Sequence, residues 1–150
     1  MDMNLGFKQR KHHEGFSLTE LIVVMVIMGV ISAVAIPFYS NYMTRNKLAE
    51  PVSTLPLLRI EMEQHYQDNR TYVDVGGDCA VDMPTLDDFD VACINQTQTT
   101  YTINAKSKYG VGLGAAGDYE YTLDHDGNAV TVKYGGDTVN ESCLRVGAQC

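Results

Sequence analysis

A carboxylate at the head of an apolar run, Glu20, is the residue of this sequence whose position most directly implies chemistry. Residues 21–39 read LIVVMVIMGVISAVAIPFY and carry no charge over nineteen residues. As an α-helix this run would be about 28 Å long, enough to cross the hydrocarbon layer of a membrane. Because a lone carboxylate buried there costs roughly 2.5 to 3.5 kcal/mol, Glu20 requires a partner that compensates its charge.

Basic residues precede the apolar run and indicate its orientation. Residues 1–15 are polar and show no periodic pattern, so we interpret them as a leader peptide; they include Lys8, Arg10 and Lys11. Positive charge on the N-terminal side keeps that end in the cytoplasm and sends the rest of the chain across. The sequence therefore predicts a single-pass protein whose N-terminus is cytoplasmic.

The residues around Glu20 resemble a known processing signal. Residues 15–20 read GFSLTE, which is similar to the prepilin signature of type IV pilins, and the similarity continues to about residue 41, including Gly29 and Pro37. In that family a dedicated membrane peptidase cuts after the glycine, here Gly15, and methylates the new N-terminal residue, here Phe16. The resemblance also implies that Glu20 pairs with the N-terminal amine of a neighbouring subunit.

Segments further along the chain extend the resemblance more loosely. They read LRIEMEQHYQDNRTY, YTINAKSKYG and YTLDHDGN, and they are similar to the minor-pilin group that contains PilE-type subunits. The resemblance implies a structural subunit of a type IV pilus whose partners are other pilin subunits, the prepilin peptidase and N-methyltransferase, and the pilus assembly machinery. It also implies residence in the bacterial inner membrane before assembly and in an extracellular filament afterwards, serving motility, adhesion or DNA uptake.

The new N-terminus implied by the resemblance supplies the charge that Glu20 needs. Cleavage after Gly15 creates an ammonium, and an opposite charge offsets the desolvation of a carboxylate when two helices pack. A subunit's own amine is held along its own helix, whereas a neighbour's can approach laterally. The pair would therefore also fix the axial stagger between subunits.

Other interpretations fit parts of the sequence. The A-x-A pattern at residues 33–35 is typical of a secretory signal cut after Ala35, and an anchored domain could hold Glu20 near the headgroups. Within the pilin architecture, a pseudopilin of a type II secretion system and a DNA-binding minor pilin are further alternatives. Without residues 1–15 the chain has eight basic and seventeen acidic residues, so nucleic acid would require a local basic patch. The candidate residues for that patch are Arg59, Lys106, Lys108 and Lys133.

The hydrophobic pattern predicts an α+β fold, with an apolar helix over 16–40 and a globular head over 41–150. In the head we expect an amphipathic helix over 41–68, a loop over 70–99, an antiparallel sheet over 100–134 and a C-terminal region over 135–150. The apolar stripe of the helix consists of Leu48, Val52, Leu55, Leu58, Met62 and Tyr66. We expect Gly29 and Pro37, together with Pro51 and Pro56, to bend or locally open the helix.

Three segments of the sheet region alternate apolar and polar residues: 100–106, 119–123 and 129–134. Asp126-Gly127 between the last two predicts a hairpin turn. Residues 124–128 read DHDGN, but the glycine stands fourth where a calcium loop of the EF-hand type has it sixth. We therefore expect a turn rather than a metal site.

The four cysteines predict two disulfides, because they all follow the membrane segment and none has the spacing of a metal site. Three connectivities are possible. Pairing Cys79 with Cys93 and Cys143 with Cys150 closes the shortest loops, and we favour it. With no nucleophile near a base, we expect no enzyme, no cofactor and no metal.

Overall fold

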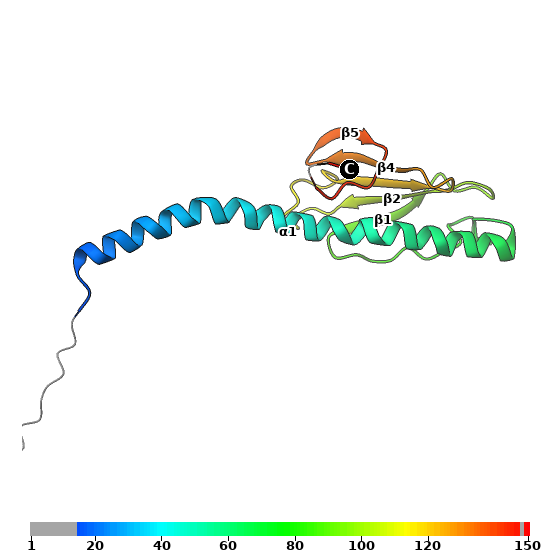
Figure 1. Ribbon diagram of the computed structural model, residues 1–150. Coiled ribbons are helices and arrows are strands. Elements are labelled where there is room, and N and C mark those ends of the chain that lie inside the picture. Colours follow the sequence, from blue (N-terminus) through cyan, green and yellow to red (C-terminus); the bar gives the residue numbers. More distant parts are fainter. Residues whose placement is uncertain (1–14, 148) are drawn as a thin grey trace, which may run out of the picture. The chain divides into compact units, whose positions relative to one another are not determined.

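A computed structural model describes residues 15–147 and 149–150; most of the expected leader, residues 1–14, lies outside the described residues. The described chain contains one long helix and a five-stranded antiparallel sheet, which confirms the α+β prediction (Figure 1). The elements are α1 (Leu18–Asn69), β1 (Phe89–Ile94), β2 (Thr102–Ser107), β3 (Glu120–Asp124), β4 (Ala129–Tyr134) and β5 (Asp137–Glu141). The chain forms two compact units, one ending at Tyr39 and the other beginning at Ser40.

Both ends of α1 are capped by local hydrogen bonds. At the start, the carbonyl of Ser17 accepts from the backbone N–H groups of Glu20 (3.0 Å) and Leu21 (3.2 Å). At the end, Arg70 takes a left-handed conformation (φ 61°), and its N–H donates to the Tyr66 carbonyl at 2.8 Å. That geometry satisfies a terminal carbonyl and stops the helix.

We expected Gly29, Pro37, Pro51 and Pro56 to bend or locally open the helix; α1 is continuous through all four, so it does not open there. A proline removes one amide donor, but the hydrogen bonds of the turns on either side persist and keep the backbone helical. A bend without an opening at Gly29 and Pro37 stays a prediction.

The second part of α1 lies along the sheet and supplies one side of the head's core (Figure 1). The predicted stripe is confirmed: Leu48, Leu55, Leu58 and Met62 are buried. Val52 and Tyr66 are partly buried against the same cluster. Pro51 is also fully buried on this face, which the periodicity did not single out. Burial of each large aliphatic side chain stabilises the head by roughly 1.5 to 3 kcal/mol.

The sheet is a meander with strand order β1-β2-β3-β4-β5. Its inner face pairs Ile103 with Leu123 and Ala105 with Tyr121, and all four side chains are buried. The three predicted strands are present as β2, β3 and β4. Two strands were missed: β1 lies within the expected loop 70–99, and β5 lies within the expected C-terminal region 135–150.

The hairpin between β3 and β4 is confirmed at residues 124–128. The carboxylate of Asp124 accepts from the backbone N–H and the side-chain amide of Asn128, both at 2.8 Å. Gly127 adopts φ 88°, a conformation that favours glycine. The Asp124 oxygens are thus used to close a turn.

The disulfides lie at opposite edges of the sheet. Cys79 is bonded to Cys93 in β1, with Cα atoms 6.1 Å apart. Cys143, just after β5, is bonded to Cys150, with Cα atoms 5.9 Å apart. The structure therefore has the two local pairings: the first joins an irregular segment to the outer strand β1, and the second closes the tail that follows the outer strand β5.

Candidate assembly surface

The unit that ends at Tyr39 presents apolar side chains on every side of its helix. Phe16 is 81% exposed, Met25 73% and Ile36 68%. The most apolar window of α1 has a mean hydropathy of 2.8 with no residue buried, so by length and composition this helix could cross a membrane. A helix that is apolar all round requires lipid or other helices as its surroundings.

Glu20 lies in the first turn of this exposed helix. Within residues 15–147 and 149–150, no hydrogen bond or ion pair involves its carboxylate. A negative charge in the first turn is favoured by the helix dipole, but that effect contributes only about 0.3 to 1 kcal/mol. The described part of the chain therefore offers no compensating cation for Glu20.

Gly15 and Phe16 precede the helix in non-helical backbone. Both are exposed, and a Cβ added at Gly15 would meet no atom within 4 Å. An exposed peptide bond outside regular secondary structure can be reached by a peptidase. The geometry of residues 15–17 is thus compatible with processing at this bond.

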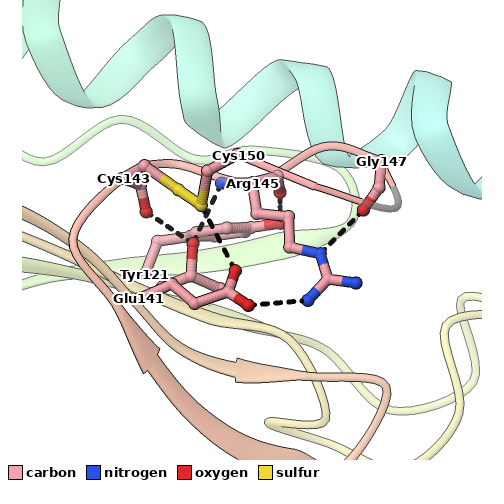
Figure 2. The surroundings of a disulfide bond; sticks show 7 residues. Tyr121, Glu141, Cys143, Arg145, Gly147 and Cys150 are labelled. Carbon is pink, nitrogen blue, oxygen red and sulfur yellow. Dashed lines mark hydrogen bonds and ion pairs between the residues drawn. A yellow bond between two sulfur atoms is a disulfide. The ribbon is translucent and has the colours of Figure 1, made fainter.

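The C-terminal disulfide sits in a network that fixes the tail to the sheet (Figure 2). The buried hydroxyl of Thr131 donates to the Cys143 carbonyl at 2.6 Å and accepts from the Arg145 N–H at 2.9 Å. Tyr121 donates to the Arg145 carbonyl at 2.7 Å. The guanidinium of Arg145 pairs with Glu141 at 3.0 Å, so the tail is held by several contacts besides the disulfide.

Glu141, Cys143 and Cys150 form the set in the described chain that most resembles metal ligands. The Sγ atom of Cys150 lies 3.2 Å from Oε2 of Glu141. Both sulfurs are used in the disulfide, and only a thiolate is a good metal ligand. This cluster is therefore structural.

The outer face of the sheet carries a row of alternating charges. Asp90 is opposite Lys106, which is opposite Glu120, which is opposite Lys133. Lys106 pairs with Glu120 at 3.2 Å, while the neighbouring Lys108 lies 3.8 Å from Asp90. The row is neutral overall, which is unsuited to phosphate backbones.

Arg59, the remaining candidate of the basic patch, is not part of this row. It lies in α1, and its guanidinium is close to Gly127 in the hairpin. Its Nε atom is buried. The structure therefore does not bring Arg59, Lys106, Lys108 and Lys133 together as one basic patch.

Two cations that sequence reasoning did not single out have a place in the head. Lys47 joins the helix to the sheet, and Arg45 lines a cavity beside the C-terminal tail. The sequence feature that could have indicated them is their position, since two basic residues lie within three positions shortly after the apolar run.

Comparison with known families identifies the family of this chain. A model of the prokaryotic N-terminal methylation motif matches residues 10–36. A second model, described as the type IV minor pilin ComP, DNA uptake sequence receptor, matches residues 37–118, which is more than half of the chain. The chain belongs to the type IV pilins. This confirms the family predicted from the GFSLTE segment and the interpretation as a pilus subunit that assembles with other pilins.

Individual pilins support the same assignment. The type IV major fimbrial protein FimA of Dichelobacter nodosus is 30% identical over 137 residues, covering 89% of this chain and 73% of FimA. A fimbrial protein of the same organism is 31% identical over 126 residues, covering 83% and 69% of the two chains. The non-core minor pilin PilV of Neisseria meningitidis shares the fold, with a TM-score of 0.53 and 19% identity over 73% of this chain and 99% of PilV.

Proposed function

We propose that the mature pilin begins at Phe16 with a methylated amine, after a prepilin peptidase has cut the bond that follows Gly15. The helix up to about residue 40 then holds the subunit in the inner membrane, with its N-terminus cytoplasmic. Assembly machinery transfers the subunit into an extracellular filament, in which the apolar helices exchange lipid for one another and the heads face outward. The match of residues 10–36 to the methylation motif supports the processing step.

The observation that carries this proposal is Glu20, a carboxylate without a partner in the described chain on an apolar, fully exposed helix. In a packed filament its desolvation would cost several kcal/mol unless a cation accompanied it. The amine of Phe16 on a neighbouring subunit is the cation that processing creates. Pairing the two would neutralise both charges at each added subunit.

Two measurements test the proposal. Mass spectrometry and N-terminal sequencing of filaments should give a chain that starts at methylated Phe16; a chain starting at Ile36 would mean that signal peptidase had cut after Ala35. Glu20→Ala should leave membrane-held subunits with a folded head but few filaments, because the neighbour's ammonium would be buried alone. Glu61→Ala, which removes an exposed carboxylate from the head part of α1, is the matched control and should assemble normally.

A second candidate function, DNA binding, follows from the description of the family model that matches residues 37–118. The charges of the described head argue against it, because Lys106 and Lys108 lie beside carboxylates and Arg59 is directed to the hairpin. Retardation of DNA at low salt that is lost in Lys106→Ala or Lys133→Ala would support this function. No retardation at low salt would exclude it.

A further inference from the structure

A polar cavity of about 280 Å³ opens beside the first turns of α1 in the head. Three of its residues, Asn41, Thr44 and Arg45, are spaced three and four positions apart and therefore share one face of the helix. That face continues, four residues after Thr44, with Leu48, which is buried in the core. The other lining residues are Tyr119 beside β3, Tyr134 at the end of β4, and Gly147 in the tail.

The cavity carries one cation and no acid. None of its lining residues is Asp or Glu. Within the described residues, no carboxylate lies within ion-pair distance of Arg45, whereas Lys47, Lys106, Lys108 and Arg145 each have one. The guanidinium of Arg145 stacks 4.0 Å from the centre of the Tyr134 ring, but its charge is paired with Glu141. Arg45 is therefore the charge available to a ligand.

The remaining groups add hydrogen-bonding capacity. Asn41 and Thr44 contribute an amide and a hydroxyl, and Tyr119 and Tyr134 contribute phenols whose rings meet edge to face at 5.1 Å. The Tyr134 hydroxyl already donates to the Val146 carbonyl at 3.4 Å. A guanidinium with neutral donors around it is the chemistry that recognises an oxyanion such as phosphate.

The position of Arg45 along the chain indicates that this phosphate belongs to a lipid headgroup. The apolar run ends at Tyr39, and Arg45, the first charged residue after it, follows six residues later in the same helix, a rise of about 9 Å. If the run crosses the hydrocarbon, that distance corresponds to the headgroup layer, where lipid phosphates lie.

We propose that this cavity binds the phosphate of an anionic phospholipid while the subunit is held in the membrane. Arg45 binds the phosphate oxygens, and the neutral side chains accept or donate to the headgroup. No acid lines the cavity, so the ammonium of a zwitterionic headgroup would find no carboxylate to pair with there. Anionic lipids are therefore preferred. The inference rests on the membrane-held stage of the proposed function.

The test uses the full chain in maltoside micelles, which contain no phosphate. Short-chain phosphatidylglycerol should produce saturable shifts in the amide NMR signals of Thr44, Arg45 and Gly147. Phosphatidylcholine of the same chain length and inorganic phosphate should bind at least several-fold more weakly. Equal binding of phosphatidylcholine would overturn the preference for anionic lipid, and equal binding of inorganic phosphate would overturn the assignment to a lipid.

Three variants separate the cavity from a general attraction of charge. Arg45→Gln should weaken phosphatidylglycerol binding about tenfold, since it removes the charge-assisted hydrogen bonds. Gly147→Val keeps every charge but places side-chain atoms next to Arg45, because an added Cβ would lie 3.8 Å from Arg45 Cζ; it should weaken binding as well. Arg70→Gln changes an exposed arginine after the end of α1 and should have no effect.

Unchanged binding in Arg45→Gln would refute the site. Equal losses in Arg45→Gln and Arg70→Gln, with none in Gly147→Val, would show that net charge alone attracts the lipid. Flotation with vesicles keeps the proposed function separate, because Arg45→Gln should remain as firmly membrane-held as the natural sequence. If the natural sequence itself did not float, the membrane-held stage would be wrong whatever the lipid titration gave.

Discussion

The ammonium of Lys47 in α1 lies 3.0 Å from Oδ1 of Asp88, the residue directly before β1. The same Nζ atom donates to the Val111 carbonyl at 2.5 Å, in the loop that follows β2. One lysine therefore joins the helix to two loop segments, one that leads into β1 and one that follows β2. Its side chain is 26% exposed and that of Asp88 is 18% exposed, so the pair is shielded from most solvent.

Lys47→Ala should lower the free energy of unfolding of the head by about 2 kcal/mol, because it leaves Asp88 and the Val111 carbonyl without their donor. Lys106→Ala is the matched control. Its pair with Glu120 is nearly as short, at 3.2 Å, but the lysine is 54% exposed, so the cost should be at most about 1 kcal/mol. Urea unfolding of both variants measures the difference, and equal costs would contradict the role given to Lys47.

The disulfides should contribute unequally to stability. Cys79 and Cys93 are 14 residues apart and Cys143 and Cys150 are 7 apart. On the chain-entropy model, removing the first bridge costs about 3 kcal/mol and removing the second about 2.4 kcal/mol. The second loss should be smaller in practice, since Thr131 and Tyr121 also hold the tail. Urea unfolding of the two paired Cys→Ser variants tests this order.

Peptide mapping without reduction tests the connectivity itself. It should yield one fragment pair containing Cys79 and Cys93 and another containing Cys143 and Cys150. A fragment that joined either of the first two cysteines to the tail would contradict the local pairing.

Tyr72 should make the head sensitive to alkali. Burial, followed by its hydrogen bond to Glu63 at 2.9 Å, raises the pKa of the Tyr72 hydroxyl from 10.0 to about 12. Because the folded pKa lies above the unfolded value, the stabilisation is complete below about pH 10 and is lost between about pH 10 and pH 12. Tyr72→Phe should show a smaller fall in stability across that window, measured as the urea midpoint at each pH. An unchanged fall would mean that Tyr72 does not contribute.

Burial also raises the pKa values of Tyr101 and Tyr121. Their ionisation at high pH also destabilises the folded head. Tyr72→Phe should therefore reduce the alkaline loss of stability without abolishing it.

The helix and the central strands were predictable because their signals are local. The uncharged run corresponds to a helix that is apolar all round. Apolar residues spaced three and four apart from Leu48 to Tyr66 correspond to one buried face of the same helix. β1 was missed although its residues, FDVACI, alternate in burial. Acidic residues directly precede it, and its exposed face carries the apolar Ala92 beside Asp90, so the alternation of apolar and polar residues is weak in the sequence. β5 reads DTVNE and has one apolar residue, so its pairing with the backbone of β4 leaves no apolar pattern in the sequence.

The candidate sites also differ in whether their signal is local in the sequence. Glu20 was recognisable because a carboxylate beside an apolar run is unusual within a single segment. The cavity at Arg45 was not, since it forms only where residues more than 70 positions apart, such as Arg45 and Tyr119, meet in the folded head. The neutral row on the sheet likewise depends on strand register, which composition does not contain.

In the hairpin, Gly127 can be compared with Gly110, because both have a positive φ but their surroundings differ. Their φ angles are 88° and 79°. A Cβ added at Gly127 would lie 3.0 Å from Cζ of Arg59, whereas one added at Gly110 would meet nothing within 4 Å. Replacement by alanine strains both positions by about 1 kcal/mol, so any excess cost at Gly127 reports the contact with Arg59.

We expect Gly127→Ala to cost about 1 kcal/mol more than Gly110→Ala, since the buried Nε of Arg59 limits how far the guanidinium can move. Urea unfolding of the two variants measures this excess. In an Arg59→Ala background the excess should vanish, which a double-mutant cycle detects as a coupling between the two positions. If the excess persisted there, its cause would be the turn backbone itself, and Arg59 would have no part in holding the hairpin against the helix.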